Sequence, residues 1–130
     1  MGYEPVSLAV DEIARKIVAA AYRVHANLGP GLLESIYEIC FCHELERSKL
    51  SYAQQVEIPI LYDGVELPGN LRLDVLVENC IICELKAVET MKEVYLAQLL
   101  TQLKLTHRRL GFLINFNVPI IKLGIKRVIV

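Results

Sequence analysis

Three charged residues interrupt an apolar stretch in the middle of this chain: Asp74, Glu84 and Lys86. They fall in two runs, 71–77 and 81–87, that are typical of adjacent β-strands. A strand alternates its faces with every residue, so Glu84 and Lys86 point to the same side. Charged side chains are costly to bury unless they are paired or bind a metal. The spacing therefore predicts a divalent-metal site with a lysine beside it.

The length of the turn between these two strands decides whether the acids meet. A two-residue loop at 78–79 would place Asp74 opposite Cys83 and send Glu84 to the other face of the sheet. A three-residue loop at 78–80 would place Asp74 opposite Glu84, with their Cβ atoms about 4.5–5.5 Å apart. A metal site therefore requires the three-residue loop or a bulge.

Carboxylate oxygens in such a pair suit Mg²⁺ or Mn²⁺. Lys86 would then orient an attacking water or stabilise the charge of a phosphate. The alternative is a partly exposed strand face on which Lys86 forms an ion pair with Glu84 or Asp74.

The elements that must position these residues follow from hydrophobic periodicity and from turn signals. Helices are expected over 7–28 and 32–47, and a third is expected to run from a capping box at Thr90–Glu93 to about residue 106. Strands are expected at 54–62, 65–67, 71–77, 81–87, 110–116 and 124–130, which gives the order ααββββαββ. The strand–helix–strand passage from 81 to 116 predicts two parallel neighbours. The predicted fold is α/β (α+β), with a single mixed sheet flanked by helices in one domain over residues 1–130.

Composition narrows the function classes. The chain is 54% apolar, and part of that surplus is expected in a homodimer interface. No run approaches the roughly 18 consecutive apolar residues of a membrane helix, so no membrane partner is expected. The N-terminus lacks a basic region followed by an apolar one, so no signal peptide is expected and the location is predicted to be cytoplasmic.

The net charge of −1 argues against strong nucleic-acid binding, but the charges are unevenly distributed. Residues 101–130 contain no acid and six cations, namely Lys104, Arg108, Arg109, Lys122, Lys126 and Arg127. Such a segment is either a phosphate-facing surface or a solvated face that balances the acidic helices.

Asp74 followed by Glu84-Leu85-Lys86 resembles the D…(D/E)-x-K core of the PD-(D/E)XK nuclease superfamily. The stretch 24–37, with Gly31, Glu34 and Tyr37, resembles the hallmark of the small GxxExxY proteins, which are assigned to that superfamily. Further similarity at 97–100 and 111–116 extends the resemblance over about residues 10–127.

The resemblance implies a restriction-endonuclease-like core with Asp74 and Glu84 as ligands of Mg²⁺ or Mn²⁺. Lys86 would be the catalytic lysine, and Glu34 would be a further metal ligand. Gln98 would begin a Q-x-x-x-Y element, from which this chain departs because Gln102 stands at the tyrosine position.

Two residues near the Gly-Pro-Gly turn at 29–31 have two possible roles. His25 would either support the site or serve as a structural histidine at the turn. Tyr37 would either support the site or be a core aromatic residue with a hydrogen-bonded hydroxyl.

The function expected from the sequence is a metal-dependent nuclease that hydrolyses phosphodiester bonds in DNA or RNA. The rival is a catalytically inactive protein with the nuclease fold that binds nucleic acid or a protein partner.

Overall fold

A computed structural model describes residues 6–130, and its first two elements are helices that pack against each other. Helix α1 covers Leu8–Leu28 and α2 covers Glu34–Arg47. Ser7 caps α1, because its hydroxyl accepts a hydrogen bond from the N–H of Val10 at 3.2 Å. Helix α1 ends at Gly29, whose φ of 65° is unfavourable for residues with a side chain.

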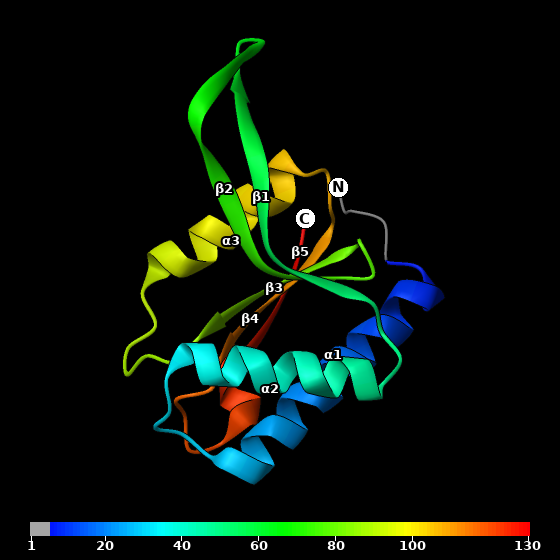
Figure 1. Ribbon diagram of the computed structural model, residues 1–130, viewed down its shortest axis with the longest axis vertical. Coiled ribbons are helices and arrows are strands. Elements are labelled where there is room, and N and C mark those ends of the chain that lie inside the picture. The colour runs from blue at the N-terminus through cyan, green and yellow to red at the C-terminus, as the bar shows by residue number, and fades with distance from the viewer. Residues whose placement is uncertain (1–5) are drawn as a thin grey trace.

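The rest of the chain forms a five-stranded sheet with one more helix (Figure 1). The elements are β1 (Tyr52–Tyr62), β2 (Val65–Val77), β3 (Ile81–Lys86), α3 (Glu93–Leu105), β4 (Leu110–Asn115), the 3₁₀ turn η1 (Ile121–Gly124) and β5 (Ile125–Ile129). The strands are adjacent in the order β1-β2-β3-β4-β5. Only β3 and β4 are parallel, as predicted for a strand–helix–strand crossover. The mixed sheet flanked by helices confirms the predicted fold class.

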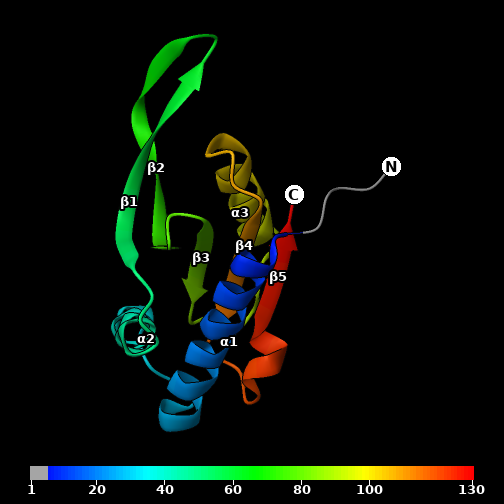
Figure 2. The same cartoon turned by 90° about the vertical axis from the view of Figure 1, so that its right-hand side faces the viewer.

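The helices cover both faces of the sheet (Figure 2). Helices α1 and α2 pack on the face that carries Cys83 and Leu85, where Phe41 and Phe112 are among the fully buried side chains. Helix α3 covers the opposite face with Leu99 and Leu103, which pack with Ile82 among others. Glu84 and Lys86 follow Ile82 at intervals of two, so they lie on the α3 face.

The expected separate strands at 65–67 and 71–77 are a single strand, so the order ααββββαββ is corrected to ααβββαββ. Pro68-Gly69 does not turn the chain. The pairing register instead shifts between Pro59 and Leu61, and the extra residues of β2 are accommodated there with Gly69 at a φ of 101°. As a result, β1 and β2 extend as a two-stranded arm beyond the rest of the sheet (Figure 1).

The capping box predicted at Thr90 is also wrong. Helix α3 begins at Glu93 with Lys92 as its N-cap, and no side chain caps it. The segment before it is fixed elsewhere, because the Asn115 side chain accepts from the N–H of Val88 at 3.1 Å and donates to its carbonyl at 3.0 Å. These contacts anchor the chain directly after β3.

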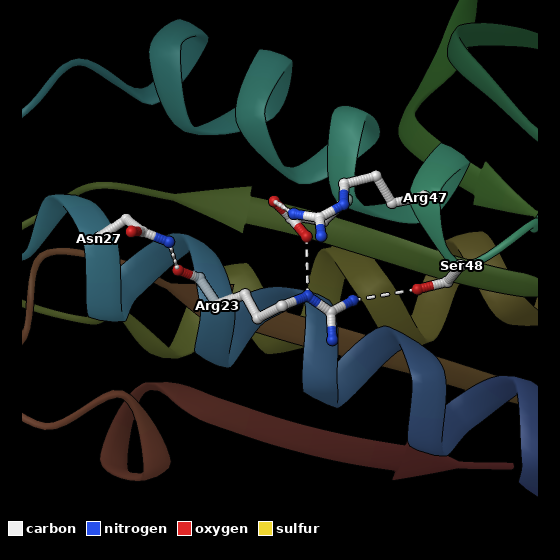
Figure 3. A network of polar contacts seen from close by, with 5 residues as sticks. Arg23, Asn27, Arg47 and Ser48 are labelled. Atoms are coloured by element: carbon white, nitrogen blue, oxygen red, sulfur yellow. Dashed lines mark hydrogen bonds and ion pairs between the residues drawn. The ribbon is translucent and has the colours of Figure 1, made fainter.

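Polar contacts join α1 to α2 (Figure 3). Arg23 Nε donates to Glu44 Oε1 at 2.7 Å, and its Nη2 donates to the Ser48 hydroxyl at 3.0 Å. Arg47 lies 3.6 Å from the other oxygen of Glu44. The hydrogen bond from Arg23 lowers the pKa of the Glu44 carboxyl. This network fixes α2, which carries Glu34 at its other end.

None of the helices among residues 6–130 combines the length and apolarity needed to cross a membrane.

Candidate functional site

The turn between β2 and β3 has the three-residue loop that the metal-site prediction required. Cα partners are Val75 with Cys83, Leu76 with Ile82 and Val77 with Ile81. The intervening Glu78 and Asn79 have φ values of 52° and 54°, which turn the chain tightly enough for the N–H of residue 80 to donate to the carbonyl of Val77 at 3.0 Å. The register therefore brings Asp74 opposite Glu84, and this prediction is confirmed.

Regular pairing between β2 and β3 extends no further than Val75 and Cys83. At the next position the side chains take over the hydrogen bonds of the ladder. The N–H of Leu85 donates to Asp74 Oδ2 at 2.9 Å, and the N–H of Asp74 donates to Glu84 Oε1 at 3.3 Å. The two acids thus stand in contact where the strands separate.

The electrostatics of this pair are those of two carboxyl groups that share a site. Burial, the Asp74 charge and a hydrogen bond from one carboxyl group to the other raise the pKa of Glu84 to about 8. Donors in the surroundings, which include the Gln102 side chain, lower it by a smaller amount. Near neutral pH the pair therefore holds a proton unless another cation replaces it.

Lys86 does not neutralise the acids. None of the ion pairs found among residues 6–130 within 4 Å involves Asp74, Glu84 or Lys86. Instead, the Lys86 ammonium lies over the ring of Tyr95 in α3, with Nζ 4.5 Å from the ring centroid. The alternative in which Lys86 simply pairs with one of the acids is therefore wrong.

Glu34 begins α2 directly after the Gly-Pro-Gly turn, on the side of the acid pair. Partial burial and the charge of Asp74 raise the pKa of Glu34, whereas Lys86 lowers it, so this carboxyl feels both groups. The Tyr37 hydroxyl holds the turn by donating to the Gly29 carbonyl at 2.5 Å and accepting from the N–H of residue 32 at 3.2 Å. Its ring stacks on Phe116 with centroids 4.8 Å apart. Tyr37 thus fixes the segment that leads into Glu34.

These residues fit a hard divalent ion only in part. Among residues 6–130, no group of three or more His, Cys, Asp and Glu side chains is gathered closely enough to hold a metal. Asp74 and Glu84 nevertheless form a carboxyl pair that holds a proton for want of a cationic partner. Such a pair suits an ion such as Mg²⁺, which takes most of its ligands from water and phosphate oxygens.

A hollow of about 500 Å³ lies beside the pair, between β2, β3 and α3. Glu84 lines it together with Arg72, Gln98 and Gln102. Gln98 is exposed, whereas Gln102 is only 7% exposed. Gln102, which stands where the resemblance expects a tyrosine, therefore contacts the acid pair through its side-chain amide.

The other sequence-predicted residues lie away from this pair. His25 Nε2 donates to the carbonyl of Val118 at 2.6 Å, which ties the end of α1 to the loop before η1. This contact gives His25 a structural role at the turn.

The structure divides the six cations of the C-terminal segment. Arg108 donates to the carbonyl and side chain of Asn79, at the start of β3, and so lies about 20 Å from the Lys86 end of that six-residue strand. Arg109 donates to the carbonyl of Val130, and Arg127 lies 3.3 Å from Asp11. The remaining three are exposed on three different elements, namely Lys104 on α3, Lys122 on η1 and Lys126 on β5.

Three residues near the site were missed from the sequence. Arg72 precedes Asp74 by two positions in β2 and lines the hollow together with Glu84. Tyr95 stands near the start of α3, where only the fold brings it under Lys86. Asn117 accepts from the N–H of Gly31 at 3.1 Å through its side chain, a contact that joins segments 86 residues apart and leaves no local pattern.

Comparison with protein families finds one match. The model of the PD-(D/E)XK nuclease superfamily covers residues 11–128. Comparisons with curated proteins and with solved structures find no significant match.

Proposed function

Because the chain belongs to the PD-(D/E)XK nuclease superfamily, we propose that it is a metal-dependent nuclease whose reacting groups are Asp74, Glu84 and Lys86. The observation that carries the proposal is the contact between Asp74 and Glu84 at the point where their strands separate. Within residues 6–130, neither these two carboxyl groups nor the Lys86 ammonium forms an ion pair within 4 Å.

The reaction would be hydrolysis of a phosphodiester. The oxygen of a water molecule forms a bond to phosphorus, one P–O ester bond breaks, and a proton from the water ends on the leaving oxygen. A divalent ion held by Asp74 and Glu84 would supply Lewis acidity to the phosphate.

The chain's own groups have distinct tasks in this reaction. The Lys86 ammonium would donate to a phosphate oxygen or to the attacking water, and the Tyr95 ring keeps it in place without removing its charge. Glu34 would accept from water that completes the ion's surroundings, since its carboxyl feels the charges of Asp74 and Lys86. Gln98 would contact the substrate at the mouth of the hollow.

The finer assignments are part of the same proposal. We propose that the chain is one of the GxxExxY proteins, because it carries Gly31, Glu34 and Tyr37 at the spacing of their motif, that its ion is Mg²⁺ or Mn²⁺, and that residues 1–130 form one domain. We propose that it acts in the cytoplasm as a homodimer, because one small domain offers one active site and a duplex has two strands.

The test is incubation with single-stranded, duplex and branched DNA and with RNA, in the presence of Mn²⁺. The variant Lys86→Met is compared with the matched control Lys16→Met, which changes an exposed lysine on α1. We expect cleavage by the wild type and the control, and a rate at least 100-fold lower for Lys86→Met. Cleavage that survives Lys86→Met unchanged would show that the activity does not come from this site.

The rival function is nucleic-acid or protein binding without cleavage. It is supported by Gln102, which stands where the Q-x-x-x-Y element has its tyrosine. Salt-sensitive binding of nucleic acid by the wild type, with no cleavage of any of these substrates, would support that function instead.

A further inference from the structure

The hollow between β2 and α3 is lined by a buried polar atom that accepts no hydrogen bond from the acid pair or from its other neighbours among residues 6–130. Oε1 of Gln102 is buried and has no hydrogen-bond partner among the described residues. A buried acceptor without a donor is costly, because this oxygen has lost its water and gained no donor in exchange. The amide lines a hollow that is open to solvent, so a ligand could supply the missing donor.

The walls of the hollow suit a flat, partly apolar ring. Leu71 from β2 and Val94 and Ala97 from α3 provide apolar surface, while Gln98 and Thr101 add polar side chains on the same helix. A volume of about 500 Å³ falls within the roughly 300–1,000 Å³ of small-molecule sites.

The position of the hollow links it to the proposed chemistry. Glu84 belongs both to the acid pair and to the wall of the hollow, and Arg72 lies on the same wall. A phosphate placed at the acid pair would therefore have its own nucleotide within reach of the hollow, with the Arg72 guanidinium available to a neighbouring phosphate.

We propose that this hollow receives one unpaired nucleobase of a nucleic-acid strand, which donates an N–H to the side-chain oxygen of Gln102. The oxygen is covered in the free protein, so the amide turns toward the hollow when the base enters. A base held in a duplex cannot enter without leaving its stack, so the preferred substrate is single-stranded or locally unpaired. The inference rests on the proposed function for the identity of the ligand, and its test does not depend on cleavage.

The test measures binding with Ca²⁺ in place of Mg²⁺, by fluorescence anisotropy of labelled single-stranded hexanucleotides. One probe carries bases at every position, and the second has the same sugar–phosphate length with abasic residues throughout. We expect the wild type to bind the base-bearing probe roughly tenfold more tightly than the abasic probe. The variant Gln102→Met, which keeps the side-chain length and removes the acceptor, should bind both probes equally.

Two controls keep the outcomes separate. Because the Gln102 amide also donates to Glu84, Mn²⁺ binding is measured for both proteins, and the two probes are compared at Ca²⁺ concentrations that saturate each protein. Loss of the base preference should persist under these conditions, which distinguishes a base contact from an effect on the ion. Thr106→Val, at the C-cap of α3, removes a hydroxyl that donates to the Gln102 backbone carbonyl at 2.8 Å and should leave the difference between the two probes intact.

Equal binding of the two probes by the wild type would overturn the proposal, as would a preference that Gln102→Met retains. Nucleoside 5′-monophosphates that bind as tightly as the hexanucleotide would assign the hollow to free nucleotides and overturn the assignment to a strand. A base preference without cleavage of any substrate would support the inference while the nuclease proposal fails.

Discussion

Replacing Glu84 with glutamine should stabilise the metal-free protein, and the gain should grow with pH. The folded pKa of Glu84 is about 8, above its ordinary value of 4.5. The folded chain therefore binds this proton more tightly than the unfolded chain between pH 4.5 and 8. Across that interval the free energy of unfolding falls as pH rises.

The size of the effect follows from the shift. Each pKa unit corresponds to about 1.4 kcal/mol, so the ionised group costs on the order of 5 kcal/mol above pH 8. In a chain of 130 residues this equals a difference in melting temperature of roughly 15–20 °C. Glu84→Gln removes the ionisable group. It retains donors for the Asp74 carboxyl and an acceptor for the Asp74 N–H, so the free energy of unfolding of the variant should not fall as pH rises.

The assay is urea unfolding of both proteins at pH 5, 6, 7, 8 and 9 with a chelator present. The control is Glu66→Gln, an exposed carboxyl on the β1–β2 arm, whose curve should run parallel to that of the wild type. Repeating the series with Mn²⁺ should restore stability to the wild type and not to Glu84→Gln. A difference between wild type and Glu84→Gln that stays constant from pH 5 to 9 would refute the reasoning, as would a variant less stable than the wild type at pH 9.

Three further perturbations test the parts around the acids. Tyr95→Leu should lower the cleavage rate and change stability by less than about 1 kcal/mol, whereas Tyr95→Phe should keep the rate, because only the ring holds Lys86. Arg23→Met should reduce the free energy of unfolding at pH 7 by about 1.5–3 kcal/mol in urea titrations. Because the pKa of Glu44 is lowered in the fold, the wild type should lose this stabilisation as pH falls below 4.5, so the two proteins should converge in acid. Tyr37→Phe should cost about 1–3 kcal/mol and weaken Mn²⁺ binding in calorimetry, since the hydroxyl that fixes the turn before α2 is lost.

Local patterns were sufficient to predict most of the fold. Helical periodicity predicts α1 and α2, and the crossover rule predicts that β3 and β4 are parallel. The errors came where tertiary context overrides a local signal. Pro68-Gly69 has the composition of a turn, but the arm absorbs it as a shift in register between β1 and β2. Thr90 has the composition of a cap, but Asn115 holds the chain at Val88 and α3 starts later.

The site divides in the same way. The meeting of Asp74 with Glu84 was predictable, because register in a hairpin depends only on loop length and on strand period. The contact of Lys86 with Tyr95 was not predictable. A loop separates the two residues, and its path does not follow from a periodic sequence pattern. The basic segment shows that residues close in sequence need not share partners in the fold. Its six cations are close in sequence, but β4, β5 and the loops send Arg108 and Arg127 to separate partners.

The end of pairing between β2 and β3 has a physical cause in the two acids themselves. A regular antiparallel ladder would press two carboxyl groups together at the position after Val75 and Cys83. Where the ladder stops, backbone donors lose their partners on the neighbouring strand, and each would be costly if it stayed unsatisfied. The same carboxyl groups accept from those donors, at 2.9 Å from Leu85 and 3.3 Å from Asp74. The acids therefore take the place of the ladder at this position and satisfy its N–H groups, which allows a polar pair to lie inside an apolar sheet.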